Sequence, residues 1–179
     1  MASSTTLGPE FLKAGIRHVP DFPKPGILFY DITTLLRDPV GFKAVIDQLA
    51  APFEGAGIDL VVGIESRGFI LGGAVADRLG AGFCPIRKPG KLPAKTIRES
   101  FQLEYGSDSL ELHQDAVTPG QRVLVVDDVL ATGGTARAAS SLVRQLGGTL
   151  HALSFLIELT FLKGRDQLGG QRVESVLQY

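Results

Sequence analysis

The chain of 179 residues contains a single cysteine, Cys84, so an intrachain disulfide is excluded. One thiol is typical of a protein from a reducing compartment, and we expect a cytoplasmic location. The sequence also lacks a run of 18 or more apolar residues, which argues against a membrane-spanning helix and a membrane partner. Residues 1–15 lack a basic segment followed by a long apolar one, so we expect no secretory signal.

An excess of positive charge is missing as well. The chain has 18 Lys and Arg against 19 Asp and Glu, a net charge of -1. Dedicated nucleic-acid-binding proteins usually carry a strong basic excess, so we expect no nucleic-acid partner. A small phosphorylated ligand, which needs only a local site, remains compatible with this balance. The composition, 44% hydrophobic and 21% charged, excludes wholesale disorder and predicts one domain over residues 1–179.

Several common catalytic signatures are absent. The sequence contains no GxxxxGK[ST], GxGxxG, GxSxG, CxxC or HExxH pattern. His18, His113 and His151 are far apart and show no metal-ligand spacing. We expect Cys84 to be a small buried hydrophobe rather than a nucleophile.

Apolar runs alternate with segments of helical periodicity along most of the chain. After Asp38-Pro39, for example, apolar residues recur at i, i+3, i+4 and i+7, as on one face of a helix. Such alternation predicts an α/β fold with a parallel sheet, whose ligands bind outside the carboxyl ends of the strands. We expect helices at about 9–19, from 38 onward, at 68–79 and at 134–146. We expect extended segments at 27–32, 58–64, 82–86, 123–126, 152–159 and 173–178.

Residues 87–115 have a different character. This stretch is more polar and matches the helical period less often than its surroundings. Its second half reads as two extended arms around Gly106-Ser107-Asp108, which is turn chemistry. We therefore predict a protruding hairpin or lid here.

The most informative segment is VLVVDDVLATGGT, residues 123–135. Four apolar residues lead directly into Asp127 and Asp128, whose burial would be costly without partners. The following loop, Ala131 to Thr135, leads into a helix, and the N-terminus of a helix favours an anion. The pattern indicates a phosphate site beside two acceptors suited to sugar hydroxyls or a metal. The alternative is a pair of surface acids followed by a glycine-rich turn.

This segment closely resembles the phosphoribosyl-pyrophosphate motif of the type I phosphoribosyltransferases. Five further segments, DFPKPGILFYDIT, GIESRGFILG, IRKPGKLP, LEYG and ELTFLKGR, are similar to those of the adenine phosphoribosyltransferases within that family. The resemblance extends from about Phe22 to Tyr179. It implies the α/β fold of type I phosphoribosyltransferases, a parallel sheet with flanking helices. It also implies a small N-terminal hood at 1–35 and a lid or hairpin at 87–115.

The resemblance also implies a reaction of purine salvage, in which adenine and phosphoribosyl pyrophosphate give AMP and pyrophosphate. Mg²⁺ would be required and would be held mainly by the substrate, with no direct protein ligand. The 5′-phosphate would bind to Ala131, Thr132, Gly133, Gly134 and Thr135. Asp127 and Asp128 would bind the ribose hydroxyls, and their charge would favour an oxocarbenium-like transition state.

The pyrophosphate side would be formed by two loops and the lid, as in the family. Basic residues of the 87–91 loop reach the pyrophosphate partly from the neighbouring subunit, so a homodimer is implied. A non-proline cis peptide is common in the family's ESRG loop. The alternative for Arg67 is a surface arginine at the start of a helix. The alternative for the basic residues of the 87–91 loop is a solvated basic turn. The implied residues are Ser66, Arg67, Arg87, Lys88, Lys91 and Tyr105.

On the adenine side, the resemblance makes Glu104 the catalytic group, placed near N7 of the base. Spacing alone favours an exposed acid in a hairpin. The base pocket implied by the resemblance comprises Leu28, Phe29, Ala131 and Leu159, although Phe29 and Leu159 are equally compatible with an ordinary core. One departure concerns Tyr30, which stands where many adenine enzymes have arginine.

Two rival functions remain on the sequence alone. A phosphoribosyltransferase fold that senses its ligand without turnover would usually carry a nucleic-acid-binding module or a basic face, and this chain shows neither. A transferase for another base, such as hypoxanthine or xanthine, commonly places a lysine near the 6-oxo group. Lys163 lies late in the chain, but its ELTFLKGR context fits the adenine pattern better.

Overall fold

A computed structural model of the chain describes residues 7–102 and 106–179. Contacts divide it into two compact units, one up to Gln48 and one from Leu49 to Tyr179. Within the described ranges, no helix has both the length and the apolar character that crossing a membrane requires.

The first unit contains short helices and a two-stranded antiparallel sheet. The helix predicted over 9–19 ends at Gly15, which corrects that prediction. Residues after Gly15 form a strand instead, because they pair with the predicted extended segment, with Arg17 opposite Asp31. The guanidinium of Arg17 donates to the Asp31 carboxylate at 2.9 Å and so supports the register. The elements are α1 (Pro9–Gly15), β1 (Arg17–Pro20), β2 (Leu28–Asp31), α2 (Thr33–Leu36) and the start of α3 (Pro39–Ala50).

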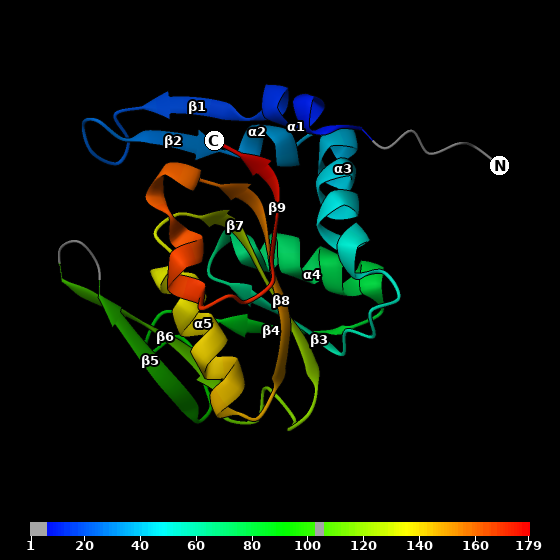
Figure 1. Ribbon diagram of the computed structural model, residues 1–179, viewed down its shortest axis with the longest axis vertical. Helices are drawn as coiled ribbons and strands as arrows, with labels where there is room; N and C mark the ends of the chain where they lie inside the picture. The colour runs from blue at the N-terminus through cyan, green and yellow to red at the C-terminus, as the bar shows by residue number, and fades with distance from the viewer. Residues whose placement is uncertain (1–6, 103–105) are drawn as a thin grey trace. The chain divides into compact units, whose positions relative to one another are not determined.

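The second unit is built on a five-stranded parallel sheet in the order β4-β3-β7-β8-β9 (Figure 1). This sheet confirms the predicted fold class. Its strands are β3 (Leu60–Ile64), β4 (Gly82–Ile86), β7 (Arg122–Leu130), β8 (Thr149–Glu158) and β9 (Val173–Gln178). Its helices are α4 (Arg67–Leu79), α5 (Gly134–Gln145), η1 (Ala51–Phe53), η2 (Thr160–Leu162) and η3 (Gly164–Leu168).

The two long helices α4 and α5 cover opposite faces of this sheet. Successive residues of a strand point to opposite faces. Val62 belongs to the same buried cluster as Leu142 of α5. Gly63, the next residue of β3, lies against α4, where a Cβ on Gly72 would come within 3.3 Å of the Gly63 Cα. Burial of both faces explains why the β3 strand consists of uninterrupted buried residues.

Strand β7 is longer than the predicted 123–126. It pairs with β3 only as far as Val126, but it pairs with β8 as far as Leu130. Asp127 and Asp128 therefore lie within a strand, not after it. They lie in the part of β7 that extends beyond its pairing with β3. This part of β7 lies beside the loop between β3 and α4.

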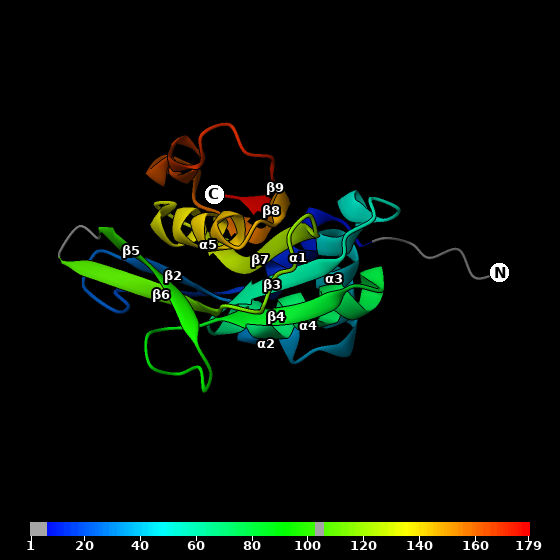
Figure 2. The same cartoon turned by 90° about the horizontal axis from the view of Figure 1, so that it is seen from below.

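The predicted hairpin is present between β4 and β7. Its arms, β5 (Thr96–Gln102) and β6 (Ser107–His113), pair antiparallel and project from the second unit (Figure 2). Phe101 pairs with Asp108 near the far end of the two arms, and it is buried in the same cluster as α5 together with Leu110 and Leu112. Residues 103–105, which lie between the two arms in the sequence, are outside the described residues.

Candidate active site

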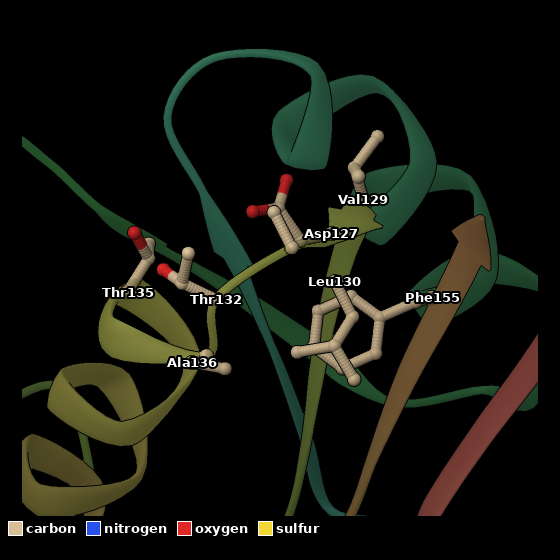
Figure 3. A pocket seen from close by; sticks show the side chains of 9 residues that line it. Asp127, Val129, Leu130, Thr132, Thr135, Ala136 and Phe155 are labelled. Carbon is tan, nitrogen blue, oxygen red and sulfur yellow. The ribbon is translucent and has the colours of Figure 1, made fainter. Parts of the chain in front are cut away.

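The loop between β7 and α5 forms a small pocket of about 80 Å³ (Figure 3). Its volume is well below the roughly 300–1,000 Å³ of a site that encloses a whole ligand, so it suits one end of a ligand. Gly133 is the N-cap of α5 and cannot cap the helix with a side chain. The first N–H groups of α5 are therefore available to an acceptor at this end. The lining residues are Asp127, Val129, Leu130, Ala131, Thr132, Gly133, Thr135, Ala136 and Phe155.

Close backbone contacts fix the shape of this loop. Gly133 has a φ of +89°, a conformation that residues with a side chain rarely adopt. A Cβ on Gly133 would lie 2.3 Å from the carbonyl oxygen of Gly164. A Cβ on Gly164 would lie 2.3 Å from the carbonyl oxygen of Ala131. The start of η3 thus packs directly against the loop, which only glycines at both positions allow.

Two neighbouring acids stand beside the loop. Burial, together with the charge of adjacent Asp128, raises the pKa of Asp127 well above its usual value. The backbone N–H of Asp128 donates to the Asp127 carboxylate at 2.9 Å and partly opposes this rise. The Asp128 carboxylate accepts a hydrogen bond from the Arg67 guanidinium. Asp127 and Asp128 thus form a buried pair of hydrogen-bond acceptors, and Asp128 is paired with the cationic side chain of Arg67.

Arg67 is the first residue of α4, which begins directly after β3. The Glu65–Ser66 peptide before it is cis, and Ser66 is exposed at the N-cap. Gly68 lets the helix approach the acids, because a Cβ there would come 2.9 Å from Asp127 Oδ1. The ESRG segment is therefore held against the end of β7.

The basic loop after β4 is organised around Glu65. Its carboxylate accepts hydrogen bonds from the Lys88 backbone N–H at 2.9 Å and from Lys91 Nζ at 2.6 Å. Arg87 Nε lies 3.4 Å away. Burial raises the pKa of Glu65, but these hydrogen bonds outweigh it and lower the pKa to about 2. The Lys88 ammonium pairs with Asp108 of β6, which ties the loop to the hairpin.

The structure therefore brings most of the predicted residues of the second unit into neighbouring positions. Leu159 adjoins the loop, since its N–H donates to the carbonyl oxygen of Leu130 at 2.9 Å. Leu28 and Phe29 lie on β2 of the first unit, where Phe29 packs edge-to-face on Phe22 with centroids 5.2 Å apart. Glu104 and Tyr105 lie outside the described residues.

Comparison with known proteins identifies this arrangement. Residues 32–157 match the family model of the phosphoribosyl transferase domain. The adenine phosphoribosyltransferase of Acidobacterium capsulatum is 61% identical over 95% of this chain and 94% of its own. The crystal structure of the enzyme from Rhodothermus marinus is 55% identical, with a TM-score of 0.92 over 96% of this chain and 98% of its own. The chain belongs to the adenine phosphoribosyltransferases.

A second similar structure contains ligands. The adenine phosphoribosyltransferase of Saccharomyces cerevisiae, complexed with an imino-altritol bisphosphate and adenine, is 43% identical to this enzyme. Its TM-score is 0.90, over 94% of this chain and 98% of that chain.

The sequence reasoning overlooked three paired residues in or beside the candidate site. Glu65 was noted only as part of a motif, although its carboxylate accepts hydrogen bonds from three residues of the basic loop. Glu158 ends the β8 strand and is buried, and its carboxylate is bonded to Arg165 at 2.7 Å. An acid at the end of an apolar run signals a buried partner, because an unpaired charge there would be costly. That signal was available in ELTFLKGR.

Proposed function

We propose that the β7–α5 loop and the acid pair bind phosphoribosyl pyrophosphate in this enzyme. The enzyme transfers the 5-phosphoribosyl group of phosphoribosyl pyrophosphate to adenine and forms AMP and pyrophosphate, a reaction of purine salvage. A bond forms between adenine N9 and the sugar carbon, and pyrophosphate leaves with the electrons of the bond that breaks. The observation that carries this proposal is that one strand, β7, presents two acids a short loop before the N-terminus of α5, whose N-cap is a glycine.

The 5′-phosphate takes the pocket formed by residues 131–135. The side chains of Thr132, in the loop, and Thr135, in the first turn of α5, both line this pocket (Figure 3). Together with the first N–H groups of the helix, they supply donors for an anion, and the helix dipole favours its charge. Gly133 and Gly134 keep this backbone free of side chains.

Asp127 and Asp128 accept hydrogen bonds from the ribose hydroxyls. Positive charge develops on the sugar as the bond to pyrophosphate breaks, and two carboxylates in a buried site stabilise it. The raised pKa of Asp127 means that its negative charge is costly in the protein alone. A cationic transition state relieves that cost, so the acid pair favours the transition state over the bound substrate.

The pyrophosphate is bound by the ESRG loop and the basic loop. Arg67 stands directly beside the acid pair, and its guanidinium offers a fork of donors to phosphate oxygens. Arg87, Lys88 and Lys91 lie around Glu65 and Asp108 and add positive charge. By resemblance, Ser66 and Tyr105 complete this side, and part of the basic loop acts on the neighbouring subunit of a homodimer.

The adenine side rests on the resemblance. Glu104, which lies outside the described residues, handles the proton of the base near N7, and closure of the hairpin keeps water from the activated sugar. Leu28, Phe29, Ala131 and Leu159 contact the base. A backbone hydrogen bond supports this role for Leu159 and Ala131. The Leu159 N–H donates to the carbonyl oxygen of Leu130, the residue before Ala131.

The donor set fits Mg²⁺ that is bound chiefly by the substrate. Among the described residues, no group of three or more His, Cys, Asp or Glu side chains could hold a metal. Mg²⁺ in phosphate sites keeps several waters and binds largely through the substrate's phosphates, so it would need no direct protein ligand here. When bound, Mg²⁺ would neutralise charge on the leaving pyrophosphate.

The wider setting follows from the same reasoning. We keep residues 1–179 as one phosphoribosyltransferase domain, since the matched family segment runs across the boundary between the two units. The cytoplasm remains the proposed compartment, because the sole cysteine excludes an internal disulfide.

A panel of bases tests the proposed reaction. The purified protein is incubated with phosphoribosyl pyrophosphate, Mg²⁺ and, separately, adenine, hypoxanthine, guanine, xanthine or uracil, and nucleotides are separated by chromatography. We expect AMP from adenine alone. Formation of another nucleotide would mean that the enzyme prefers a different base. Absence of nucleotide formation with every base would contradict the proposed reaction. Thr135→Ala tests the phosphate role, with ribose 5-phosphate binding about threefold weaker or more.

A further inference from the structure

We propose that the ion pair between Glu158 and Arg165 is a positioning device for the nucleotide site. In this role it holds the residues before and after Leu159 so that the phosphate loop and the Leu159 backbone keep their geometry. Neither side chain lines the pocket at the loop. The inference rests on the proposed binding of the 5′-phosphate by residues 131–135.

The pair is two-pronged and well buried on its acidic side. Arg165 Nε donates to Glu158 Oε1 and Arg165 Nη2 donates to Glu158 Oε2, both at 2.7 Å. Arg165 Nη1 also donates to the carbonyl oxygen of Val173 at 2.9 Å, and the Ser175 hydroxyl donates to Glu158 Oε2 at 2.5 Å. One guanidinium therefore joins the end of β8, the start of η3 and strand β9.

Glu158 and Arg165 flank residues 159–164, the segment that packs against the phosphate loop. Glu158 directly precedes Leu159, whose N–H donates to Leu130. Arg165 directly follows Gly164, whose carbonyl oxygen and Cα face Gly133 and Ala131 across gaps too small for a Cβ. Fixing Arg165 therefore fixes the backbone that touches the loop.

The backbone of this segment needs such a fixed end. Lys163 has a φ of +53°, a left-handed conformation that is uncommon for a residue with a side chain. That conformation turns the chain between η2 and η3 and delivers Gly164 to the loop. A conformation of this kind persists only where the surroundings determine it, and the two-pronged pair does so.

A role in stability alone explains the pair poorly. A buried ion pair often stabilises a fold no better than apolar residues of the same volume. The planar fork of arginine does have a geometric advantage, since it fixes two oxygens in one orientation. The arrangement therefore points to control of geometry at the adjoining loop.

Arg165→Lys tests this inference, because lysine keeps the charge but cannot span both carboxylate oxygens, Val173 and Ser175. We expect the Kd for ribose 5-phosphate, measured by calorimetry, to rise about tenfold. We expect the KM for phosphoribosyl pyrophosphate to rise in parallel, with kcat within about threefold. Arg172→Lys is the matched control, since Arg172 forms an exposed pair with Glu174 nearby, and its Kd should stay within twofold.

The outcomes separate this inference from the function it rests on. A lower melting temperature with an unchanged Kd would mean a purely structural pair and would overturn the inference. If Arg165→Lys does not fold, Ser175→Ala removes one hydrogen bond to the pair, and the Kd should rise about threefold. An unchanged Kd for Ser175→Ala would then overturn it. Weakened binding in Arg165→Lys beside normal binding in Thr135→Ala would contradict the proposed phosphate role instead.

Discussion

Replacing Gly133 with alanine should disable the phosphate loop while leaving the rest of the fold in place. Two costs follow from the structure. The φ of +89° is unfavourable for a residue with a Cβ by about 1–2 kcal/mol. The new Cβ would also lie 2.3 Å from the carbonyl oxygen of Gly164, so backbone must move by about 1 Å. Overpacking of this kind costs about 1–3 kcal/mol, which gives a total of about 2–5 kcal/mol.

The chain provides a matched control for the backbone cost. Gly120 has a φ of +86°, but a Cβ there would meet nothing within 4 Å. Gly120→Ala should therefore cost only about 1–2 kcal/mol and leave the site unchanged. The difference between the two variants isolates the contact between the loop and Gly164.

Urea unfolding and initial rates measure both consequences. A 1 Å displacement of a binding loop can cost about a hundredfold in rate, so kcat/KM for phosphoribosyl pyrophosphate should fall by about that factor in Gly133→Ala. Gly120→Ala should keep kcat/KM within twofold. If the two variants lose equal stability and Gly133→Ala keeps its kcat/KM, the close contact has no role in the site.

Three other substitutions test the charges of the site. Asp127→Asn should have a higher melting temperature than the wild type at pH 8, because the raised pKa of Asp127 makes ionisation costly only in the folded state. This difference in melting temperature should disappear near pH 4, and an equal difference at both pH values would refute the reasoning. Glu65→Gln should lose about 1–3 kcal/mol of stability at pH 7, a loss that disappears as the pH falls from about 4.5 toward 2, since the folded pKa of Glu65 is about 2; a pH-independent loss in urea unfolding would contradict it. Glu104→Gln should lower kcat by about a hundredfold with a small effect on KM, and an unchanged kcat would remove Glu104 from the chemistry.

Much of the sheet could be predicted because its strands are buried on both faces. The run Leu60–Ile64 is short and apolar, and it proved to be a strand that is buried throughout. The six residues from Val173 also formed the predicted strand, although polar residues interrupt this run. The N-terminal strand was missed, because Arg17–Pro20 follows a helical pattern and becomes extended only through its pairing with Leu28–Asp31. That information lies in the tertiary structure and not in local periodicity.

The same distinction applies to the site. Asp127 and the glycines of the loop could be predicted as candidate site residues because their order along the chain is itself the signal. Glu65 and Arg165 were not found, because each acts on residues distant in sequence or packed around a turn. The length of β7 was underestimated for a related reason. Its hydrogen bonds to β8 carry the strand on to Leu130, past two acids that would ordinarily end an apolar run.

The cations proposed for pyrophosphate share one property: each is already paired with a carboxylate. Arg67 is held by Asp128, Lys88 by Asp108, and Lys91 by Glu65. An incoming pyrophosphate must therefore exchange partners, and an exchange that leaves a buried carboxylate unpaired is costly.

Asp128 is the decisive case, because it is the most buried of these three acids. In the proposed site, phosphoribosyl pyrophosphate offers phosphate oxygens to Arg67 and ribose hydroxyls to Asp128 in one molecule. Pyrophosphate alone would occupy Arg67 but leave Asp128 without a donor. We therefore expect the two halves of the substrate to bind interdependently, so that a sugar carrying a pyrophosphate is preferred over either part separately.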